Sequence, residues 1–325
     1  MTTRRVGAAL VLLAAAAAFA APALAPHALD QRFVALLNAP PTVPRLVDDR
    51  GAWHLPFIHP WRLVNQLEQT YEQDRSTRVR LVWFANRRLV SSSDEARAPL
   101  LLLGSDSLGR DVFSRLVYGA RTSLGLAAVA SLGAILLGGT LGATAGYAGG
   151  IVDDLLMRAS DFVLVLPAMY VALGLRSALP LVLDAWTVFA FLAAIFAVIG
   201  TPYVARGVRA IVRTEARLDY ASAAAALGAG HARVLVRHLL PAARGFLVVE
   251  ATTLVPAFIV AEATLSYVGL GFPDGVSSWG TMLHEASSIR AFTDFPWLLS
   301  PAAAMFVVVL GLNLAFQHRP PLSQA

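Results

Sequence analysis

Lysine and cysteine are both missing from this chain of 325 residues, and each absence excludes a kind of site. Without cysteine, neither a disulfide framework nor a thiolate metal site can form. All 26 basic residues are arginine, whereas a Walker A loop needs a lysine to contact the β- and γ-phosphates of a nucleotide. The chain therefore cannot itself be a P-loop ATPase.

Charged residues are also scarce, at 14% of the chain, whereas 57% are hydrophobic. A typical soluble domain carries about 25% charged residues, so an ordinary soluble globule is excluded. Several stretches reach the roughly 20 apolar residues that cross a bilayer core of about 30 Å. We therefore expect an all-α, polytopic transmembrane helical bundle. Its six expected spans cover residues 6–25, 123–148, 162–183, 185–204, 246–270 and 297–316.

Sequence patterns of catalysis and metal binding are missing as well. The seven histidines show no H-E-x-x-H spacing, since His284-Glu285 lacks a second histidine, and no G-x-S-x-G elbow occurs. The net charge of +5 invites a nucleic-acid interpretation, but the arginines cluster beside the apolar runs, where membrane topology accounts for them. We expect a protein that is not an enzyme, binds no nucleic acid and holds no metal or cofactor of its own.

Arginines between the fourth and fifth spans determine the expected orientation. This loop, residues 206–244, contains seven arginines against Glu215 and Asp219, so the positive-inside rule places it in the cytoplasm. Counting spans in both directions places both termini there, including a tail at residues 317–325, and also the short link at 149–158. The seven are Arg206, Arg209, Arg213, Arg217, Arg233, Arg237 and Arg244.

The first span, residues 1–26, has two open interpretations. Arg4-Arg5, an alanine-rich run and Ala23-Leu24-Ala25 fit a retained span and also a secretory signal with an A-x-A cleavage site. Cleavage would leave the orientation of the other spans unchanged, so charge counting does not decide between them. We favour a retained span.

In this topology, residues 27–118 form a small extracytoplasmic insert, and residues 119–316 form a core with five spans. Within the insert, residues 78–89 alternate in the manner of a strand, and residues 61–71 favour a short helix. We therefore expect a folded insert and not a disordered linker.

An apolar stripe precedes the second span. Val112, Leu116 and Ala120 share one helix face, which predicts a helix lying along the outer membrane surface. Charged residues surround the stripe, and both interfacial anchoring with structural ion pairs and contact with a substrate-delivery protein are open; we favour the first. They are Asp106, Arg110, Asp111, Arg115 and Arg121.

The cytoplasmic loop contains a short helix made of small residues. Asp219 is a candidate N-cap for a helix at 220–227, because its side chain can accept hydrogen bonds from free backbone N–H groups. Four consecutive alanines at 223–226 give this helix high propensity and a thin cylinder. A thin helix can seat deeply in a groove on a partner, although a basic connector with alanine filler fits the same pattern.

A glycine hinge follows this helix. Gly228 and Gly230 end it, since glycine tolerates the left-handed conformation found after helix C-termini. A second short helix at 231–240 then leads to Pro241, which either stops it or starts the next helix. Helix, hinge and helix together form a candidate lever.

Residues 104–124 closely resemble the entry segment of permease subunits of peptide-type ABC importers. The specific similarity is to the second, C-type subunit of the dipeptide, oligopeptide and nickel branch. Two further blocks agree in the right order. One is the loop just described, whose family pattern is Glu-Ala-Ala, three residues, Gly, nine residues, Ile-x-Leu-Pro; the other is 262–271 followed by 278–283. The resemblance covers about 103–314.

The resemblance implies roles for three sets of residues. The ATPase-docking set is Asp219, Tyr220, Ser222, Ala223, Ala224, Leu227, Gly228, His238, Leu240 and Pro241. The extracytoplasmic entry set is Gly104, Asp106, Gly109, Arg110, Asp111, Arg115, Gly119 and Arg121. The set around the end of the fifth span is Glu262, Gly269, Gly271, Trp279 and Gly280. Ser222 stands where the family pattern has glutamate and His238 where it has isoleucine, although the spacing from Gly228 to Pro241 is kept.

The resemblance further implies a type I ABC importer permease of the bacterial inner (cytoplasmic) membrane, forming half of a translocation pathway for peptides or similar small solutes. Its implied partners are a second homologous permease, two cytoplasmic ATPases that bind ATP and Mg²⁺, and an extracytoplasmic solute-binding protein. An ion-coupled secondary transporter and a non-transporting membrane anchor are the alternatives. The first of these predicts inverted repeats with broken helices, which the sequence does not show.

Glycines in the second span predict close contact with another helix. A helix of the same chain and a helix of a partner permease both fit this role. The glycines are Gly133, Gly138, Gly139, Gly142 and Gly146.

Overall fold

The computed structural model describes residues 2–49, 51–167, 170–171, 173–174, 183–273 and 275–316. Contacts between residues divide them into two compact units. The core unit consists mainly of Gly125–Leu265, and the insert unit consists of Ala8–Leu124 and Ser266–Gly311.

Among the described residues, four helical segments are long and apolar enough to cross a membrane. Two of them are single helices, α3 (Val112–Ala148) and α6 (Ala185–Glu215). The third runs from His231 to Tyr267 and ends in α9 (Arg244–Tyr267), and the fourth contains α12 (Ser300–Phe316). They contain the second, fourth and sixth expected spans and most of the fifth, which ends at Tyr267, three residues earlier than expected.

The two other expected spans are only partly represented. Helices α1 (Thr2–Phe19) and α2 (Ala21–Leu24) cover the first. The expected span at 162–183 overlaps the end of α4 (Gly150–Val165), and the rest of it lies largely outside the described residues. The count of six spans therefore stays a prediction. Because α4 begins at Gly150, most of the expected link at 149–158 is helical.

The separate surface helix expected around residues 112–120 is wrong, because these residues are the first turns of α3. The Asp111 carboxylate accepts hydrogen bonds from the backbone N–H groups of Phe113 (3.1 Å) and Ser114 (3.2 Å), which caps the helix at this point. No proline occurs between Val112 and Ala148, so nothing removes a backbone donor and breaks the helix.

Small residues bring α3 against α6 in the core unit. A Cβ added to Gly138 would lie 2.6 Å from the carbonyl oxygen of Thr201, and one added to Gly142 would lie 2.3 Å from that of Ala205. The predicted close contact is confirmed, and the neighbour is a helix of the same chain. This spacing of small residues lets two backbones approach without a layer of side chains between them.

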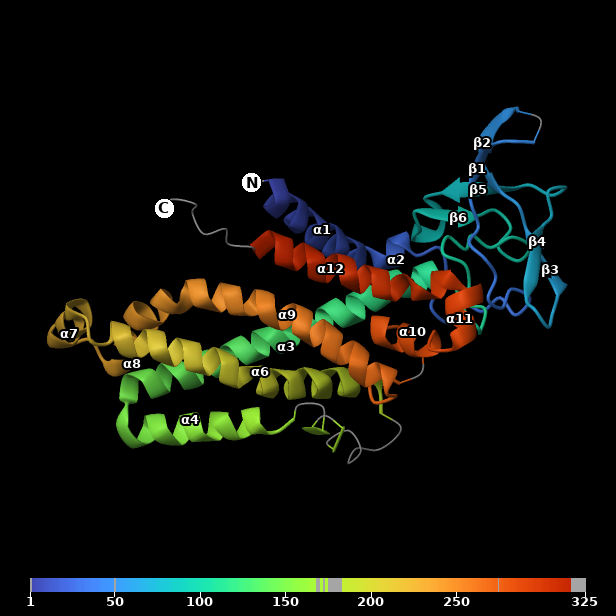
Figure 1. Cartoon of the computed structure of the whole chain (residues 1–325). Coiled ribbons are helices and arrows are strands. Elements are labelled where there is room, and N and C mark those ends of the chain that lie inside the picture. The colour runs from blue at the N-terminus through green and yellow to red at the C-terminus, as the bar shows by residue number, and fades with distance from the viewer. Residues whose placement is uncertain are drawn as a thin grey trace, which may run out of the picture. The chain divides into compact units, whose positions relative to one another are not determined.

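Helix α6 also packs on α9 (Figure 1). The rings of Phe196 and Phe258 stack with centroids 5.4 Å apart. Pro202 and Pro256 lie inside α6 and α9, and both helices continue past them.

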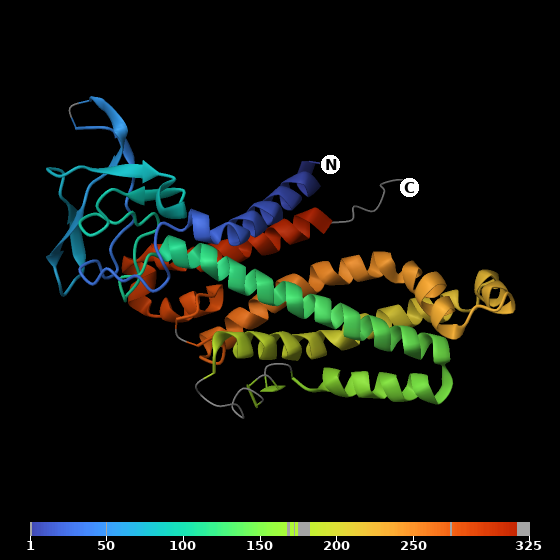
Figure 2. The same ribbon diagram turned by 180° about the vertical axis from the view of Figure 1, so that it is seen from behind.

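The insert unit contains six short strands (Figure 2). Four of them form an antiparallel sheet in the order β1-β2-β5-β6, and the other two form the hairpin β3-β4. The strands are β1 (Arg45–Val47), β2 (Trp53–Ile58), β3 (Trp61–Asn65), β4 (Thr70–Gln73), β5 (Val79–Trp83) and β6 (Val90–Ser92). Ile58, Val79, Leu81 and Leu100 form the buried core of the larger sheet. The expectation of a strand within 78–89 is confirmed by β5.

The expected short helix at 61–71 is wrong, because these residues form most of the β3-β4 hairpin. The Asn65 side chain accepts hydrogen bonds from the backbone N–H groups of Leu67 (2.9 Å) and Glu68 (3.3 Å), and Gln69 takes a left-handed φ of 53°. An asparagine that bonds the backbone two and three residues ahead favours a turn over a helix.

Candidate functional site

The expected docking helix is present as α7 (Asp219–Ala226). It begins at Asp219 itself, one residue before the expected start, a difference within the usual uncertainty of helix ends. Leu227, directly after the helix, is exposed, and Tyr220 is partly exposed. The Ser222 hydroxyl donates to the carbonyl of Asp219 (2.9 Å), so the residue that replaces the family glutamate is turned back onto its own helix.

The hinge after α7 is a left-handed glycine. Gly228 has φ +85°. The backbone N–H of the next residue, Ala229, donates a hydrogen bond to the carbonyl of Ala224 in the helix (3.1 Å). This is the glycine-terminated helix end expected from the sequence.

The second helix of the loop differs from the expected regular helix at 231–240. A short α8 (His231–Arg233) is followed by a wider π-helical stretch at Val234–Leu239 and a 3₁₀ turn at Leu240–Ala243. Pro241 lies in the first turn of that 3₁₀ segment, so it starts a new segment that leads directly into α9. His238 lies in the π-helical stretch, whose turns are wider than those of an α-helix because its hydrogen bonds join residues five positions apart.

Two side-chain contacts attach the loop to the core unit. The Tyr220 hydroxyl donates to the Glu215 carboxylate at the end of α6 (2.6 Å), and this bond raises the pKa of Tyr220 to about 12. The Tyr147 hydroxyl, one residue before the end of α3, lies 2.8 Å from Nδ1 of His231. The loop is therefore bonded to the C-terminal ends of α6 and α3 within the core unit.

An ion-pair cluster joins α4 to the C-terminal part of α6. Arg209 meets the Asp153 carboxylate through Nε and through Nη2 (2.6 Å), and Arg213 lies 3.4 Å from the same carboxylate. The hydrogen-bonded Arg209 guanidinium holds the pKa of Asp153 below its usual value. Sequence reasoning used these arginines only to orient the chain, and the signal that it missed was the acidic residue in the first turn of α4.

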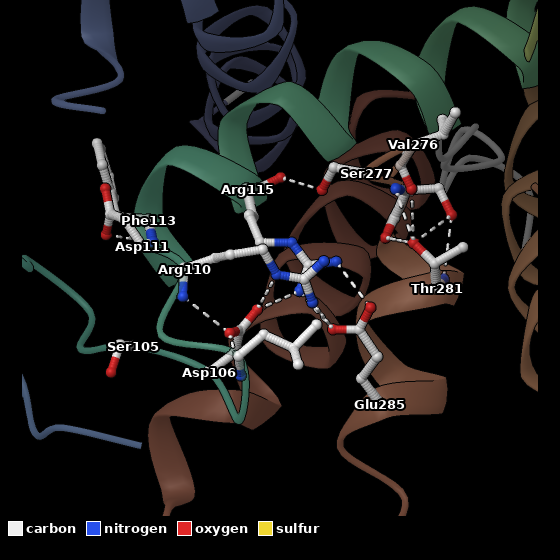
Figure 3. Close-up of polar contacts among 12 residues, drawn as sticks. Ser105, Asp106, Arg110, Asp111, Phe113, Arg115, Val276, Ser277, Thr281 and Glu285 are labelled. Atoms are coloured by element: carbon white, nitrogen blue, oxygen red, sulfur yellow. Dashed lines mark hydrogen bonds and ion pairs between the residues drawn. The ribbon is translucent and has the colours of Figure 1, made fainter. Parts of the chain in front are cut away.

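The entry set forms a second cluster, shown in Figure 3. The Asp106 carboxylate accepts hydrogen bonds from Arg110 Nε (2.8 Å) and Arg115 Nη1 (2.6 Å), and Glu285 accepts from Arg110 Nη2 (2.8 Å) and Arg115 Nη2 (3.0 Å). Asp106, Arg110 and Arg115 are buried, and the Glu285 side chain is 32% exposed. Two cations and two carboxylates balance their charges, which is the condition for keeping ionised groups buried.

Backbone contacts join the same two segments. The Trp279 indole N–H donates to the carbonyl of Leu116 (3.1 Å), and the Ser277 hydroxyl donates to the carbonyl of Arg115 (2.8 Å). A Cβ added to Gly119 would lie 3.3 Å from Trp279. The start of α3 and helix α10 (Trp279–Glu285) therefore form one packed site, which the sequence motifs did not predict.

The other members of the entry set have structural partners. Gly104 and Gly109 both have φ +73°, and a Cβ on either would lie within 2.6 Å of a backbone oxygen of the preceding segment. Asp111 caps α3 and lies 3.2 Å from Nδ1 of His27. Arg121 is exposed on α3 and lies outside the cluster.

The residues of the set around the end of the fifth span belong to different units. Glu262 is fully buried in the core unit, whereas Gly269, Gly271 and Gly280 belong to the insert unit. Gly269 has φ +82° and Gly280 lies in the first turns of α10. Sequence reasoning missed Glu285, because it weighed this residue only as half of a metal motif.

Comparison with known proteins gives the family. Residues 138–317 match the family described as "Binding-protein-dependent transport system inner membrane component". The oligopeptide transport system permease protein OppC of Lactococcus lactis subsp. cremoris (strain SK11) is 34% identical over 224 residues, which cover 68% of this chain and 74% of that one. The chain belongs to this family.

Other relatives of this permease have similar identity. The OppC protein of Bacillus subtilis (strain 168) is 35% identical over 212 residues, covering 65% of this chain and 67% of its own. The dipeptide transport system permease protein DppC of Alkalihalophilus pseudofirmus is 35% identical over 213 residues, with the same shares covered.

A solved structure shows the fold of the permease. A chain of the MetNI methionine ABC transporter in an inward-facing conformation has a TM-score of 0.50 and 18% identity, over 62% of this chain and 93% of that one. The permease is thus an inner-membrane transport subunit with the ABC permease fold, and its family implies a solute-binding protein and an ATPase as partners.

Proposed function

We propose that the permease forms half of the translocation pathway of an ATP-driven importer for peptides or similar small solutes in the bacterial inner membrane. A second homologous permease forms the other half. Two separate ATPases bind ATP and Mg²⁺, and an extracytoplasmic protein delivers the solute. Relatives named for oligopeptide and dipeptide transport, at 34–35% identity, support this solute class.

The observation that carries the proposal is the docking helix α7. It is a thin, alanine-rich cylinder, its neighbour Leu227 exposes an apolar side chain, and Gly228 turns the chain sharply after it. A helix of this kind fits a groove on an ATPase, and an exposed apolar residue beside it gives that contact hydrophobic area. Ser222 supplies no carboxylate for a salt bridge, which costs little because an exposed pair contributes only about 0–1 kcal/mol.

Attachment of the loop within the core unit allows a push on α7 to reach the spans. Tyr220 bonds to the end of α6, and His231 bonds to the end of α3. Further along α6, Arg209 bonds to Asp153 of α4. Closure of the ATPases then shifts the pathway between its outward- and inward-facing states, because the ATPases bind the loop differently in the two states.

The arginine-rich loop at 206–244 faces the cytoplasm in this proposal, as do both termini, and the insert at 27–118 faces the outside. The positive-inside rule supports this orientation. The entry cluster of Asp106, Arg110, Arg115 and Glu285 then holds the outer end of α3 against α10 by charge-assisted hydrogen bonds.

Reconstitution tests the proposal. We expect the permease to co-purify with two ATPase subunits and to support peptide uptake into proteoliposomes only with ATP. Ala224→Trp and Gly228→Arg should abolish that uptake while the protein still inserts in the membrane, because both changes obstruct the docking surface. Uptake driven by a proton gradient without ATP would overturn the proposal in favour of a secondary transporter. ATPase recruitment without any uptake would favour a non-transporting anchor.

A further inference from the structure

The turn between β5 and β6 is bonded to the end of the first helix. The backbone N–H of Leu89 donates to the carbonyl of Ala23 (2.7 Å), and the Arg88 guanidinium donates to the carbonyl of Pro26. Both acceptors lie at or just beyond α2, and Figure 1 shows β5 and β6 beside that helix. The position of the turn relative to α2 is therefore determined by one backbone and one side-chain contact within the insert unit.

This turn exposes large aromatic side chains. Phe84 is 79% exposed, and Trp83 before it is also exposed. Phe84 and Arg87 take left-handed φ values of 55° and 63°, a conformation that costs a non-glycine residue roughly 1–2 kcal/mol. Exposed aromatic residues on a strained backbone are typical of a functional contact, because folding alone favours neither feature.

The helix beside the turn is uncovered as well. Leu12 and Leu13 on α1 are exposed, and Phe19 at its end is 89% exposed. In an inner-membrane protein, apolar side chains on an uncovered helix contact lipid. The exposed aromatic turn and the exposed apolar residues of α1 belong to the same unit.

The chemistry of the turn fits the boundary between lipid headgroups and acyl chains. Tryptophan is enriched at this level of membrane proteins, and arginine side chains extend from it toward the phosphates. Trp83, Phe84 and the exposed Arg87 lie within five consecutive residues, in a turn that is bonded to α2.

We propose that residues 83–89 form a membrane anchor, in which Trp83 and Phe84 insert into the phospholipid interface and Arg87 faces the lipid phosphates. The anchor holds the insert against the bilayer. The outer leaflet is the one contacted, and this detail alone rests on the orientation in the proposed function.

The absence of cysteine permits a direct test with single-cysteine variants of the full chain, assembled with its partners in phospholipid vesicles. Phe84→Cys would carry an environment-sensitive fluorophore. Leu67→Cys is the matched control, because Leu67 is also apolar and 88% exposed, and it lies in the turn of the β3-β4 hairpin. Figures 1 and 2 show that hairpin at the opposite end of the insert from α2.

Spin-labelled phospholipid should quench roughly half of the Phe84→Cys emission, since an interfacial side chain lies about 5–10 Å into the headgroup–acyl boundary. The Leu67→Cys emission should fall much less, and iodide in the water should show the reverse order. Equal quenching of the two probes by lipid would overturn the anchor. A Phe84→Cys probe that responds to added solute-binding protein and not to lipid would overturn it in favour of a protein contact.

Two additions keep the result unambiguous. Trp83→Cys replaces Phe84→Cys if the latter fails to assemble, with the same expected quenching. A membrane-impermeant maleimide applied from outside should label Leu67→Cys. Labelling only from the cytoplasmic side would contradict the proposed orientation, whereas lipid quenching at residue 84 would still support the anchor, so the two failures are distinguishable.

Discussion

Glu285 accepts hydrogen bonds from both terminal nitrogens of the Arg115 guanidinium, and this bidentate pair joins α10 to the first turn of α3. The two residues are 170 positions apart in the sequence. A planar guanidinium that meets a carboxylate through two parallel bonds sets the orientation of both partners as well as their distance. The pair therefore fixes how α10 packs on the first turn of α3 within the insert unit.

Removing one acid of this cluster should destabilise the permease, because it leaves a buried arginine without its counter-charge. We expect Asp106→Ala to lower the free energy of unfolding by about 3–5 kcal/mol. Glu285→Ala should cost less, since water reaches its side chain, which is 32% exposed. Thermal unfolding of the purified protein in detergent measures both changes.

Asp294→Ala is the control for that series. Asp294 pairs with Arg290 at 3.2 Å, but both side chains are about half exposed. An exposed pair contributes about 0–1 kcal/mol, so this variant should unfold close to the parent temperature. Equal losses for Asp106→Ala and Asp294→Ala would contradict the buried role of the cluster.

The contact between α3 and α6 predicts a contrast between neighbouring glycines. A Cβ at position 142 would lie 2.3 Å from the carbonyl oxygen of Ala205, whereas one at position 139 meets no atom within 4 Å. We expect Gly142→Ala to cost about 1–3 kcal/mol through overpacking. Gly139→Ala should leave stability unchanged or raise it by up to about 1 kcal/mol, because alanine is the better helix former. Thermal unfolding of the two variants tests the contrast, and equal effects would contradict the close approach.

Periodicity and spacing predicted the long apolar helices and the short helix α7, since both depend on local composition. Gly228 follows α7 as the sequence suggested, although the helix ends at Ala226, one residue earlier than expected, and Gly138 and Gly142 of the second span lie at a helix contact. The hairpin at 61–73 was not predicted, because the turn depends on one side chain, Asn65, that bonds its own backbone.

The sequence motifs identified several residues of each site, but they did not identify the distant residues that bond to them. Nothing in the local sequence around Arg115 indicates Glu285, and nothing around Arg209 indicates Asp153. Each pair joins segments that are distant in the chain, and only packing of the helices brings them together. The Ser222 substitution is visible in sequence, but its bond to the Asp219 carbonyl depends on the helix geometry.

Tyr220 should lose its hydroxyl proton at an unusually high pH. Its hydrogen bond to the Glu215 carboxylate raises the pKa from 10.0 to about 12, because ionisation would place two negative charges side by side. A group with a raised folded-state pKa contributes stability fully below its unfolded pKa, and that contribution disappears as the pH rises from about 10 through about 12. Tyrosinate absorbance of the parent minus that of Tyr220→Phe should therefore rise near pH 12.

Glu215→Gln is the control for this titration. Removing the carboxylate charge should return Tyr220 toward its ordinary pKa, so the same difference spectrum would rise near pH 10. A Tyr220 signal near pH 10 in the parent protein would show that the bond to Glu215 does not form in solution.

The left-handed glycine after α7 gives a test of coupling through the backbone conformation of the turn. Gly228 has φ +85°, whereas Gly230, two residues on, has φ −67° and ψ 154°, a conformation open to any residue. An added Cβ meets nothing within 4 Å at either position, so the two sites differ in backbone conformation and not in packing.

Valine at 228 should cost roughly 1–2 kcal/mol in the native turn, which lowers the population of the correctly placed α7 by about 5–30-fold. We expect Gly228→Val to lose most of its ATP-driven uptake while Gly230→Val retains it, with both proteins inserted in the membrane at equal levels. Solute imported per ATP hydrolysed, measured in proteoliposomes, checks this, and Gly228→Asn should fall between the two because asparagine tolerates the left-handed region better than valine. Equal uptake by the two valine variants would mean that the placement of α7 does not depend on the turn at Gly228.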